Sequence, residues 1–367
     1  MNILIQGIGL AAPRFSIDRQ NALGFAKTML HEPDRHTRGL EALYRMSAVR
    51  KRGSVLLEHD ASSGALIELE QTFYPRAECS AQRGPSTATR NARFTVEALP
   101  LGRRAAMAAL DSAGIAPADV THLIVVTCTG FYSPGLDVGL IHDLQLPAET
   151  ERVQIGFMGC HGAINALRVA RGLLAAEPNA KVLIVCVELC SLHYQYGWQT
   201  DRVVSNAIFA DGAAALVLGS AGEDGRELPD VAATGSRLIE QSQDAMTWQI
   251  GDFGFEMTLS AEVPGIIEAQ LRDYLARWLA RHSLRIDDIA GWAIHPGGPR
   301  ILRAVQTALA LSDEQLQPAR QVLADHGNMS SPTMLFILDR FLRERRPRPW
   351  LMLGFGPGLE VEVALLR

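Results

Sequence analysis

Apolar, β-branched runs alternate with amphipathic helical segments along this chain, and that alternation is the strongest restriction on its fold. The run at 122–130 follows a helical segment at 101–115, in which Gly114 supplies a stop signal. Similar runs occur at 181–189 and 213–220. Continuous apolar runs between helices are typical of strands buried within a sheet, so the sequence predicts an α/β fold.

The second half of the chain repeats the order of elements in the first. It contains a helix, a strand, a further helix and two closing strands, at 265–284, 291–296, Pro299 onward, 350–356 and 359–367. We interpret this repetition as an internal duplication. Its junction is expected near 220–232, where the composition is typical of a linker. The predicted units are therefore residues 1–222 and 223–367.

Composition and charge exclude several classes of protein. The 367 residues are 47% hydrophobic and 20% charged, which is typical of a globular chain with a large core. The net charge of −5 is spread without a basic block, so no nucleic-acid surface is expected. The apolar runs are far below the roughly 20 residues that a membrane-spanning helix needs. Residues 1–13 lack a basic region, so they predict a first strand rather than a leader.

The five cysteines show neither a CxxC pair nor zinc-type spacing. Neither a metal site nor a disulfide framework is therefore expected, and a cytoplasmic location is favoured. The least regular segment is 59–95, within which residues 80–91 predict an ordered surface loop. The N-terminal glycines lack the GxGxxG pattern, so no nucleotide site is assigned.

Cys160 is the first candidate for chemistry. It lies where an apolar strand gives way to a helical pattern that begins at about His161. A cysteine at a helix N-terminus meets free N–H groups and the positive end of the helix dipole, and both favour the thiolate. Gly156, Gly159 and Gly162 allow a sharp turn and leave room for a substrate. The alternative is that Cys160 is a small buried hydrophobic residue.

His295 and Asn328 are candidate partners of this cysteine. His295 ends a predicted strand before a Pro-Gly-Gly turn, the position that Cys160 holds in the first half. Functional side chains gather at such carboxyl ends of strands. Asn328 lies in a polar turn, and its amide can donate a hydrogen bond to a developing oxyanion. Alternatively it is a helix cap, a role for which Ser330 and Ser331 are equally suitable.

Other histidines and cysteines carry weaker signals. The side chain of His161 is expected to face away from Cys160, because adjacent helix positions diverge by about 100°. Four residues are interpreted as packing or pocket-lining residues: His193, His326, Cys186 and Cys190.

Six motifs taken together resemble the type III polyketide synthases, the chalcone synthase-like branch of the thiolase fold. They lie at 156–168, 206–220, 263–267, 294–302, 326–338 and 353–366. The resemblance covers nearly the whole chain. It implies a thiolase-like α/β fold, in which two duplicated halves form a five-layered αβαβα core, and it implies a homodimer.

The resemblance also implies an activity. Cys160 would be the nucleophile that accepts an acyl group from acyl-CoA, with His295 as the other half of a thiolate–imidazolium pair. His295 and Asn328 would hold the thioester oxygen and stabilise the enolate formed when malonyl-CoA loses CO2. The chain would be extended iteratively and cyclised to a pyrone or resorcinol-type product. No metal or other cofactor is required, and an acyl carrier protein is a possible alternative donor.

The family's cavity residues correspond to positions in this sequence. Phe209 matches a gatekeeper phenylalanine, and Met257 falls where a second one is expected. Ser133 matches a position that reaches into the partner's cavity in the family dimer. Further residues expected to line the cavity are His193, Trp248, Ser330, Gly354, Phe355, Gly356, Pro357 and Gly358.

The CoA-binding positions depart from the family's pattern. Cationic positions of the family fall on uncharged residues, including Met46. Nearby basic residues offered as substitutes are Arg38, Arg45, Arg50, Lys51 and Arg52. Segments 128–137 and 187–195 resemble bacterial members that accept fatty acyl starters and make alkylpyrones or alkylresorcinols.

Two other functions compete with this one. A single-round condensing enzyme of the β-ketoacyl synthase III kind shares Cys, His and Asn, but the segments at 295–299 and 354–366 argue against it. A catalytically silent thiolase-fold subunit is disfavoured by the intact trio. Product mass separates the first two functions, and acylation of Cys160 would exclude the third.

Overall fold

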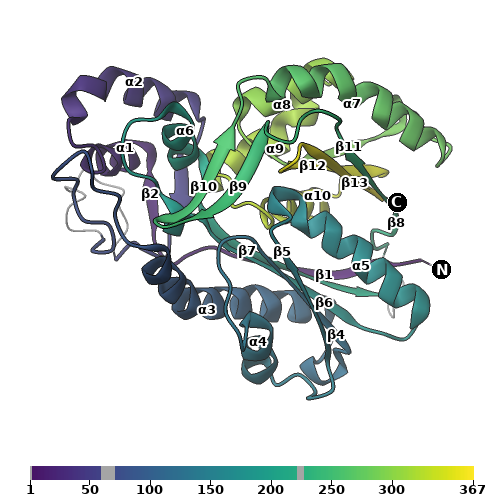
Figure 1. The fold of residues 1–367 in the computed structure, drawn as a ribbon. Coiled ribbons are helices and arrows are strands. Elements are labelled where there is room, and N and C mark those ends of the chain that lie inside the picture. The colour runs from purple at the N-terminus through teal and green to yellow at the C-terminus, as the bar shows by residue number, and fades with distance from the viewer. Residues whose placement is uncertain (1, 59–70, 221–226) are drawn as a thin grey trace.

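The computed structural model describes residues 2–58, 71–220 and 227–367, and it consists of two stacked sheets with helices on both sides and between them (Figure 1). The helices α3 (Thr87–Ala113) and α4 (Leu136–Leu144) cover the outer face of the first sheet. The helices α5 (Gly162–Ala176) and α10 (Thr333–Arg343) lie between the sheets. The second sheet is covered by α7 (Val263–Ala280), on which α8 (Pro299–Leu309) packs. The predicted five-layered α/β fold is confirmed.

The first sheet has the order β1 (Leu4–Ala11), β7 (Asp211–Gly219), β6 (Val182–Leu189), β4 (His122–Thr127) and β5 (Glu151–Gly156). The strand β4 is parallel to β5 and β6, whereas β7 is antiparallel to its two neighbours. Every residue of β6 and β7 is buried, because helices cover both faces of the sheet. By contrast, β5 is an edge strand with exposed side chains.

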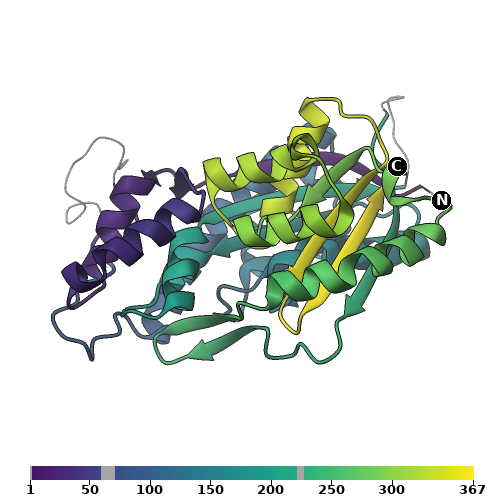
Figure 2. The ribbon, with the colours of Figure 1, turned by 90° about the horizontal axis from the view of Figure 1, so that it is seen from above.

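The second sheet has the order β11 (Gly291–Ile294), β12 (Trp350–Gly356), β13 (Glu360–Leu366) and β8 (Val231–Leu238). The helix α9 (Asp313–His326) packs against β11 and leads into the turn that holds Asn328. As Figure 2 shows, both chain termini lie at one end of the molecule, opposite the N-terminal helices.

Smaller elements cover the end where the candidate residues gather. They are α1 (Arg19–Thr28), α2 (Pro33–Met46), α6 (Thr200–Ile208), the pair β2 (Ser16–Asp18) and β3 (Lys51–Gly53), and the hairpin β9 (Met246–Gly251) and β10 (Gly254–Leu259). The helix α2 packs against α6, and α6 packs against β10. These elements therefore form one packed layer over this end of the sheets.

The predicted strands and the helix starting at Pro299 are confirmed, but the helix predicted at 101–115 begins much earlier. It starts at Thr87, where Ser86 accepts a hydrogen bond from the backbone N–H of Thr89, so the loop predicted at 80–91 is wrong from Thr87 onward. Pro100 lies inside this helix. The helix continues through it because the flanking apolar face is buried, which outweighs the loss of one backbone hydrogen bond.

Other expectations concern the ends of segments. Gly114 ends α3 with a φ of 69°, the left-handed conformation that favours glycine, as the sequence predicts. Part of the predicted junction between the halves, 221–226, lies outside the described residues, as does 59–70 of the irregular segment. In the described ranges, the helices are too short or too polar to cross a membrane.

Candidate active site

The turn after β5 places Cys160 at the start of α5. Phe157 and Gly159 have φ values of 57° and 74°, and a short 3-10 turn then carries the chain into the helix. A Cβ atom at Gly159 would lie 2.8 Å from Cδ of Pro357, so a glycine is needed for the close approach of the two loops. Cys160 is buried at this junction.

His295 and Asn328 come to the same place from the second half. His295 directly follows β11, and its N–H donates to the carbonyl of Leu353 at 2.8 Å. Asn328 forms an isolated bridge with Phe209, in which its N–H donates to Ile208 and its carbonyl accepts from Ala210, both at 2.9 Å. The bridge joins the two halves beside the cysteine.

The side chain of Asn328 has a fixed orientation. Its Oδ1 accepts a hydrogen bond from the N–H of Ser330 at 2.8 Å. The amide nitrogen lies 4.0 Å from Sγ of Cys160 and beside the ring of His295. The two ring nitrogens of His295 have no hydrogen-bond partner among the residues described. The cavity therefore presents a donor and an unengaged imidazole next to the sulfur.

All three predicted residues line one cavity of about 30 Å³, together with Phe209, Met257 and Phe355. Residues far apart in the sequence thus meet as expected. His161 does face away from this cavity, because its ring bonds Asn165.

Burial controls the protonation states of Cys160 and His295. Removal from water raises the pKa of Cys160 to about 11, although hydrogen bonds from Ser330 and Asn328 act in the opposite direction. Burial, followed by the electrostatic effect of the neighbouring His161, lowers the pKa of His295 to about 3. The expected thiolate–imidazolium pair is therefore not the favoured form of the free enzyme. Desolvation outweighs the helix N-terminus, and the site holds a thiol and a neutral imidazole.

A larger cavity of about 220 Å³ adjoins the Cys160 cavity, and exposed residues such as Met46 line it. It lies between α2, α6 and α8, and it shares Val204, Ile208, Leu259, Gly297 and Ile301 with the Cys160 cavity. Arg300 is the one basic residue among its described lining residues.

Two further cavities, of about 20 Å³ each, lie beyond Phe209 and Met257. Trp248 lines both, faces Met257 across the β9–β10 hairpin, and donates from Nε1 to the carbonyl of Cys128 at 2.7 Å. Cys190, expected to pack in the core, lines both cavities too. These aromatic and sulfur-containing side chains divide the interior into small compartments.

His193 lines the last of these cavities in a fixed state. Its Nε2 donates to the carbonyl of Thr129 at 2.7 Å, and its Nδ1 accepts from the N–H of Phe255 at 3.0 Å. Its ring also stacks on that of Phe255. Burial lowers the pKa of His193 to about 3, so the residue is a neutral wall.

The remaining predicted cavity residues divide into two groups. Phe355 lines the Cys160 cavity, and Ser330, Gly356 and Pro357 line the next one. Three line none of the four cavities described: Ser133, Gly354 and Gly358. Gly354 instead packs against His161, and Ser133 is exposed before a cis proline.

The expectation that Arg52 binds CoA is wrong. Its side chain points into the protein, where the guanidinium donates to the carbonyls of Asn206 and Phe209 and lies over the ring of Tyr194. The guanidinium supports the wall behind Phe209 and cannot reach the surface. Only 2% of the residue is exposed.

The other basic candidates for CoA binding do not line the cavity of about 220 Å³. Arg50 is engaged by Asp325 at 2.6 Å, and Arg38, Arg45 and Lys51 do not line the cavity. The part of α2 that does line it includes Met46, which is 61% exposed.

Sequence reasoning missed Glu188. This fully buried carboxylate accepts hydrogen bonds from the N–H of Cys128 at 2.9 Å, from Thr129 at 2.8 Å and from Ser331 at 2.6 Å. Burial raises its pKa. Cys128 also lies 3.3 Å from Ser330, so this network supports the wall beside Cys160. An acidic residue within an otherwise apolar strand was the available signal.

Two groups of described side chains have the spacing of metal ligands. They are His122 with Glu151 and Glu177, and His161 with Glu360 and Glu362. In the second group, Arg168 already pairs with Glu362.

Comparison with known families decides what kind of protein carries this site. A family described as chalcone and stilbene synthases matches with its N-terminal domain at residues 4–222 and with its C-terminal domain at 230–367. The chain belongs to the chalcone and stilbene synthase family. The N-terminal match includes Cys160 and the C-terminal match includes His295 and Asn328, so the family covers both halves of the site.

Three bacterial relatives illustrate the range of this family. A 1,3,6,8-tetrahydroxynaphthalene synthase of Streptomyces peucetius subsp. caesius is 37% identical, over 76% of this chain and 75% of its own length. The α-pyrone synthesis polyketide synthase-like Pks18 of Mycobacterium tuberculosis is 30% identical, over 98% of this chain and 89% of its own length. A 3,5-dihydroxyphenylacetyl-CoA synthase of Streptomyces toyocaensis is 31% identical, over 99% and 89%.

Solved structures agree with this assignment. The crystal structure of PKS-I from the brown alga Ectocarpus siliculosus has a TM-score of 0.92 and 32% identity, and the match covers 100% of this chain and 98% of that one. The protein is a type III polyketide synthase, an acyltransferase that extends its substrate iteratively and cyclises the product. The single-round alternative is disfavoured.

Proposed function

We propose that this synthase loads an acyl-CoA starter on Cys160, extends it with malonyl-CoA and releases a pyrone or resorcinol-type product. One observation carries the proposal. Cys160, His295 and Asn328 line a cavity that shares five lining residues with a larger cavity between α2, α6 and α8. A thioester on a long carrier can therefore reach the sulfur while its carrier remains outside.

Acyl loading uses the neutral pair. As Sγ of Cys160 attacks the thioester carbon, its proton passes to the imidazole of His295, and the CoA sulfur leaves with a proton returned from that ring. The carbonyl oxygen becomes negative in the transition state, and the amide of Asn328 donates to it. The raised pKa of Cys160 makes the nearby base necessary, since little thiolate forms in the absence of a base.

Extension uses the same donors. When the malonyl group loses CO2, the electrons of the broken C–C bond form an enolate, whose oxygen meets the Asn328 amide and an N–H of His295. The enolate carbon then attacks the acyl carbon on Cys160, the bond from that carbon to Sγ breaks, and the sulfur leaves as a thiolate that takes up a proton. A malonyl carboxylate is poorly solvated in this apolar cavity, whereas the enolate is met by fixed donors. Loss of CO2 is therefore favoured.

The inner walls limit the product. Compartments of about 20 to 30 Å³ hold no more than about a water molecule each. A growing polyketide therefore needs Phe209, Met257 or Trp248 to move. Met257 is unbranched and adaptable, whereas Trp248 is anchored by its hydrogen bond. We assign Met257 as the mobile wall and Trp248 as the fixed limit on chain length.

The starter and its delivery are part of the same proposal. The relative named for α-pyrone synthesis supports a lactone product. The resemblance of segments 128–137 and 187–195 to bacterial members favours a fatty acyl starter. Arg300 at the entrance is a candidate contact for the phosphates of CoA. An acyl carrier protein is the alternative donor.

The experiment is mass spectrometry of products from the purified enzyme with malonyl-CoA and a panel of acyl-CoA starters. Products with two or more added ketide units, absent with Cys160→Ala, are the expected result. One added unit would favour the single-round alternative, and unchanged products from the variant would refute the role of Cys160. A parallel reaction with acyl carrier protein thioesters identifies the preferred donor.

A homodimer in the cytoplasm completes the proposal. Phe131 and Phe157 are 48% and 39% exposed, their ring centroids are 6.3 Å apart, and the exposed edge strand β5 ends beside them. A second copy would cover this aromatic surface, and the neighbouring Ser133 would then approach the partner. Analytical ultracentrifugation of the wild type and of Phe131→Asp tests this. A monomeric wild type would refute it. The five free thiols suit a reducing compartment.

A further inference from the structure

Three side chains with the spacing of metal ligands gather at the end of the first sheet that is remote from Cys160. His122 begins β4, Glu151 begins β5, and Glu177 directly follows α5. The parallel strands β4 and β5 pair His122 with Glu151, and α5 packs against both strands. The ligand atoms of the three residues lie within 4.8 Å of one another. Because α5 has 15 residues, about 22 Å of helix separates this group from the nucleophile.

His122 is a buried residue with one ring nitrogen that lacks a partner. Only 2% of the residue is exposed, and its Nε2 has no hydrogen-bond partner among the residues described. Oε2 of Glu151 lies 3.6 Å from this nitrogen, which is too far for a hydrogen bond. A buried polar atom without a partner costs free energy. Nε2 therefore faces the carboxylates with its bonding capacity unused.

The other ring nitrogen of His122 is fixed. Nδ1 lies 2.8 Å from Oγ1 of Thr121. That hydroxyl donates to the carbonyl of Lys181 at 3.1 Å and accepts from the N–H of the same residue at 3.0 Å. With the hydroxyl proton directed to this carbonyl, Nδ1 carries a proton and donates it to Oγ1, so Nε2 keeps a lone pair. A histidine that ligates a metal ion has this arrangement, in which the second N–H is held by an oxygen.

The two carboxylates of the group lack a cation. Neither Glu151 nor Glu177 pairs with a lysine or arginine in the described part of the chain. Glu177 also stands at the C-terminal end of α5, where the negative end of the helix dipole disfavours a carboxylate. A cation bound between the two side chains offsets both unfavourable effects.

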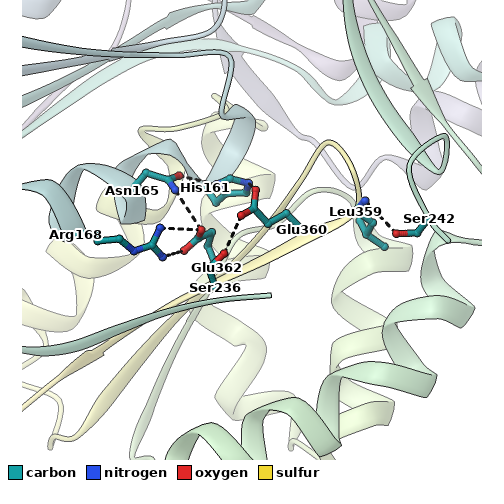
Figure 3. Close-up of polar contacts among 8 residues, drawn as sticks. All are labelled: His161, Asn165, Arg168, Ser236, Ser242, Leu359, Glu360 and Glu362. Atoms are coloured by element: carbon teal, nitrogen blue, oxygen red, sulfur yellow. Dashed lines mark hydrogen bonds and ion pairs between the residues drawn. The ribbon is translucent and has the colours of Figure 1, made fainter. Parts of the chain in front are cut away.

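The other group with metal-ligand spacing already holds a cation (Figure 3). Arg168 donates two hydrogen bonds to Glu362, and Nδ2 of Asn165 donates to the same carboxylate. The Oδ1 of that amide lies 2.7 Å from Nδ1 of His161, and Glu360 lies beside the ring. An arginine therefore supplies positive charge in this group, whereas the group around His122 has none.

We propose that His122, Glu151 and Glu177 bind one divalent transition-metal ion, for which zinc is the best match. One imidazole nitrogen and two carboxylate oxygens are zinc ligands, and the two negative charges balance the charge of the ion. Water fills the fourth position, because both glutamates are exposed. Calcium and magnesium prefer sites made of oxygen alone and should bind weakly. The ion closes the loop from β5 through Cys160 to the end of α5, so it stabilises the segment that carries the nucleophile.

The binding test uses the full-length enzyme without a histidine tag, stripped with a chelator and dialysed against zinc. Elemental analysis should find one zinc ion per chain, and no zinc above the stripped background would overturn the proposal. Glu177→Gln removes one ligand at an exposed position, so the affinity for zinc should fall roughly tenfold or more. Glu149→Gln, the matched control, removes an exposed carboxylate that is not a ligand and should leave the affinity within about twofold, because salt screens such charges. An equal loss in the two variants would overturn the assigned ligands.

The identity of the ligands is tested by X-ray absorption at the zinc edge. Nitrogen and oxygen neighbours at about 2.0–2.2 Å, with the scattering pattern of an imidazole, are the expected result. Sulfur at about 2.3 Å would place the ion on a cysteine such as the exposed Cys79 and would overturn the assignment. Zinc that is retained in Glu177→Gln but lost in Glu360→Gln would overturn it as well, since the ion would then occupy the second group.

Calorimetry tests the stabilising role. Zinc at a hundredfold excess over its Kd should raise the midpoint of thermal unfolding by about 3 °C in the wild type and should have no effect in Glu177→Gln. An unchanged midpoint in the wild type would overturn this role. The site lies outside the cavity of Cys160, so the inference does not rest on the proposed function of that residue.

Discussion

The protonation state of Cys160 separates two mechanisms, one that starts from a neutral thiol and imidazole and one that starts from a thiolate–imidazolium pair. Burial raises the pKa of this thiol to about 11. At pH 8 roughly one molecule in a thousand would then carry the thiolate. Because only the thiolate reacts with iodoacetamide, the alkylation rate should increase about tenfold per pH unit between pH 7 and pH 10. The alkylation rate increases with pH because the raised pKa leaves the thiol protonated at neutral pH, so each pH unit adds thiolate.

The assay follows the peptide that contains Cys160, because Cys79 is exposed and reacts independently. The rate at Cys79 in the same sample is the internal control for reagent and pH. His295→Gln should leave the slope for Cys160 unchanged, since the neutral ring adds no charge in the free enzyme. A rate that is flat from pH 6 to 9 and becomes steep in His295→Gln would refute the argument and establish a thiolate–imidazolium pair.

Three further predictions follow from the site. Asn328→Ala removes one donor to the enolate, so release of CO2 from malonyl-CoA should fall about a hundredfold, corresponding to about 3 kcal/mol; an unaltered rate would exclude this role. Trp248→Ala joins the two inner cavities, so longer products should appear in the mass spectrum, and an identical product range would show that Trp248 sets no limit. Arg52→Met leaves two buried carbonyls without their charged donor, so chemical denaturation should show a loss of about 3 kcal/mol, whereas Lys51→Met on the surface should be neutral.

The sequence was sufficient to predict that Cys160 and His295 meet, because both residues lie just after strands end. Cys160 and His295 follow strands in matching positions of the two halves, and turns there bring side chains to a common end of the sheets. Strands such as the one predicted at 181–189 could also be recognised, because a strand buried on both faces has a continuous run of apolar residues.

Residues whose role depends on the interior could not be predicted in this way. Arg52 is basic and close to expected CoA contacts, but only the folded chain reveals the carbonyls that it binds. The carboxylate of Glu188 collects donors from β4 and from the turn before α10, which no local pattern connects. The helix predicted at 101–115 lacks its first turns, which include Pro100, because the tertiary packing that carries α3 through this proline is invisible in the sequence.

The bridge between Phe209 and Asn328 has a consequence for engineering this enzyme. One residue shapes the passage for substrate, the other presents the amide, and backbone hydrogen bonds of 2.9 Å hold their segments together. A substitution at Phe209 that shifts its backbone is therefore expected to shift the segment that carries the Asn328 amide as well. If both residues act as proposed, a change in starter range and a change in turnover will be coupled at this point, across the two halves of the chain.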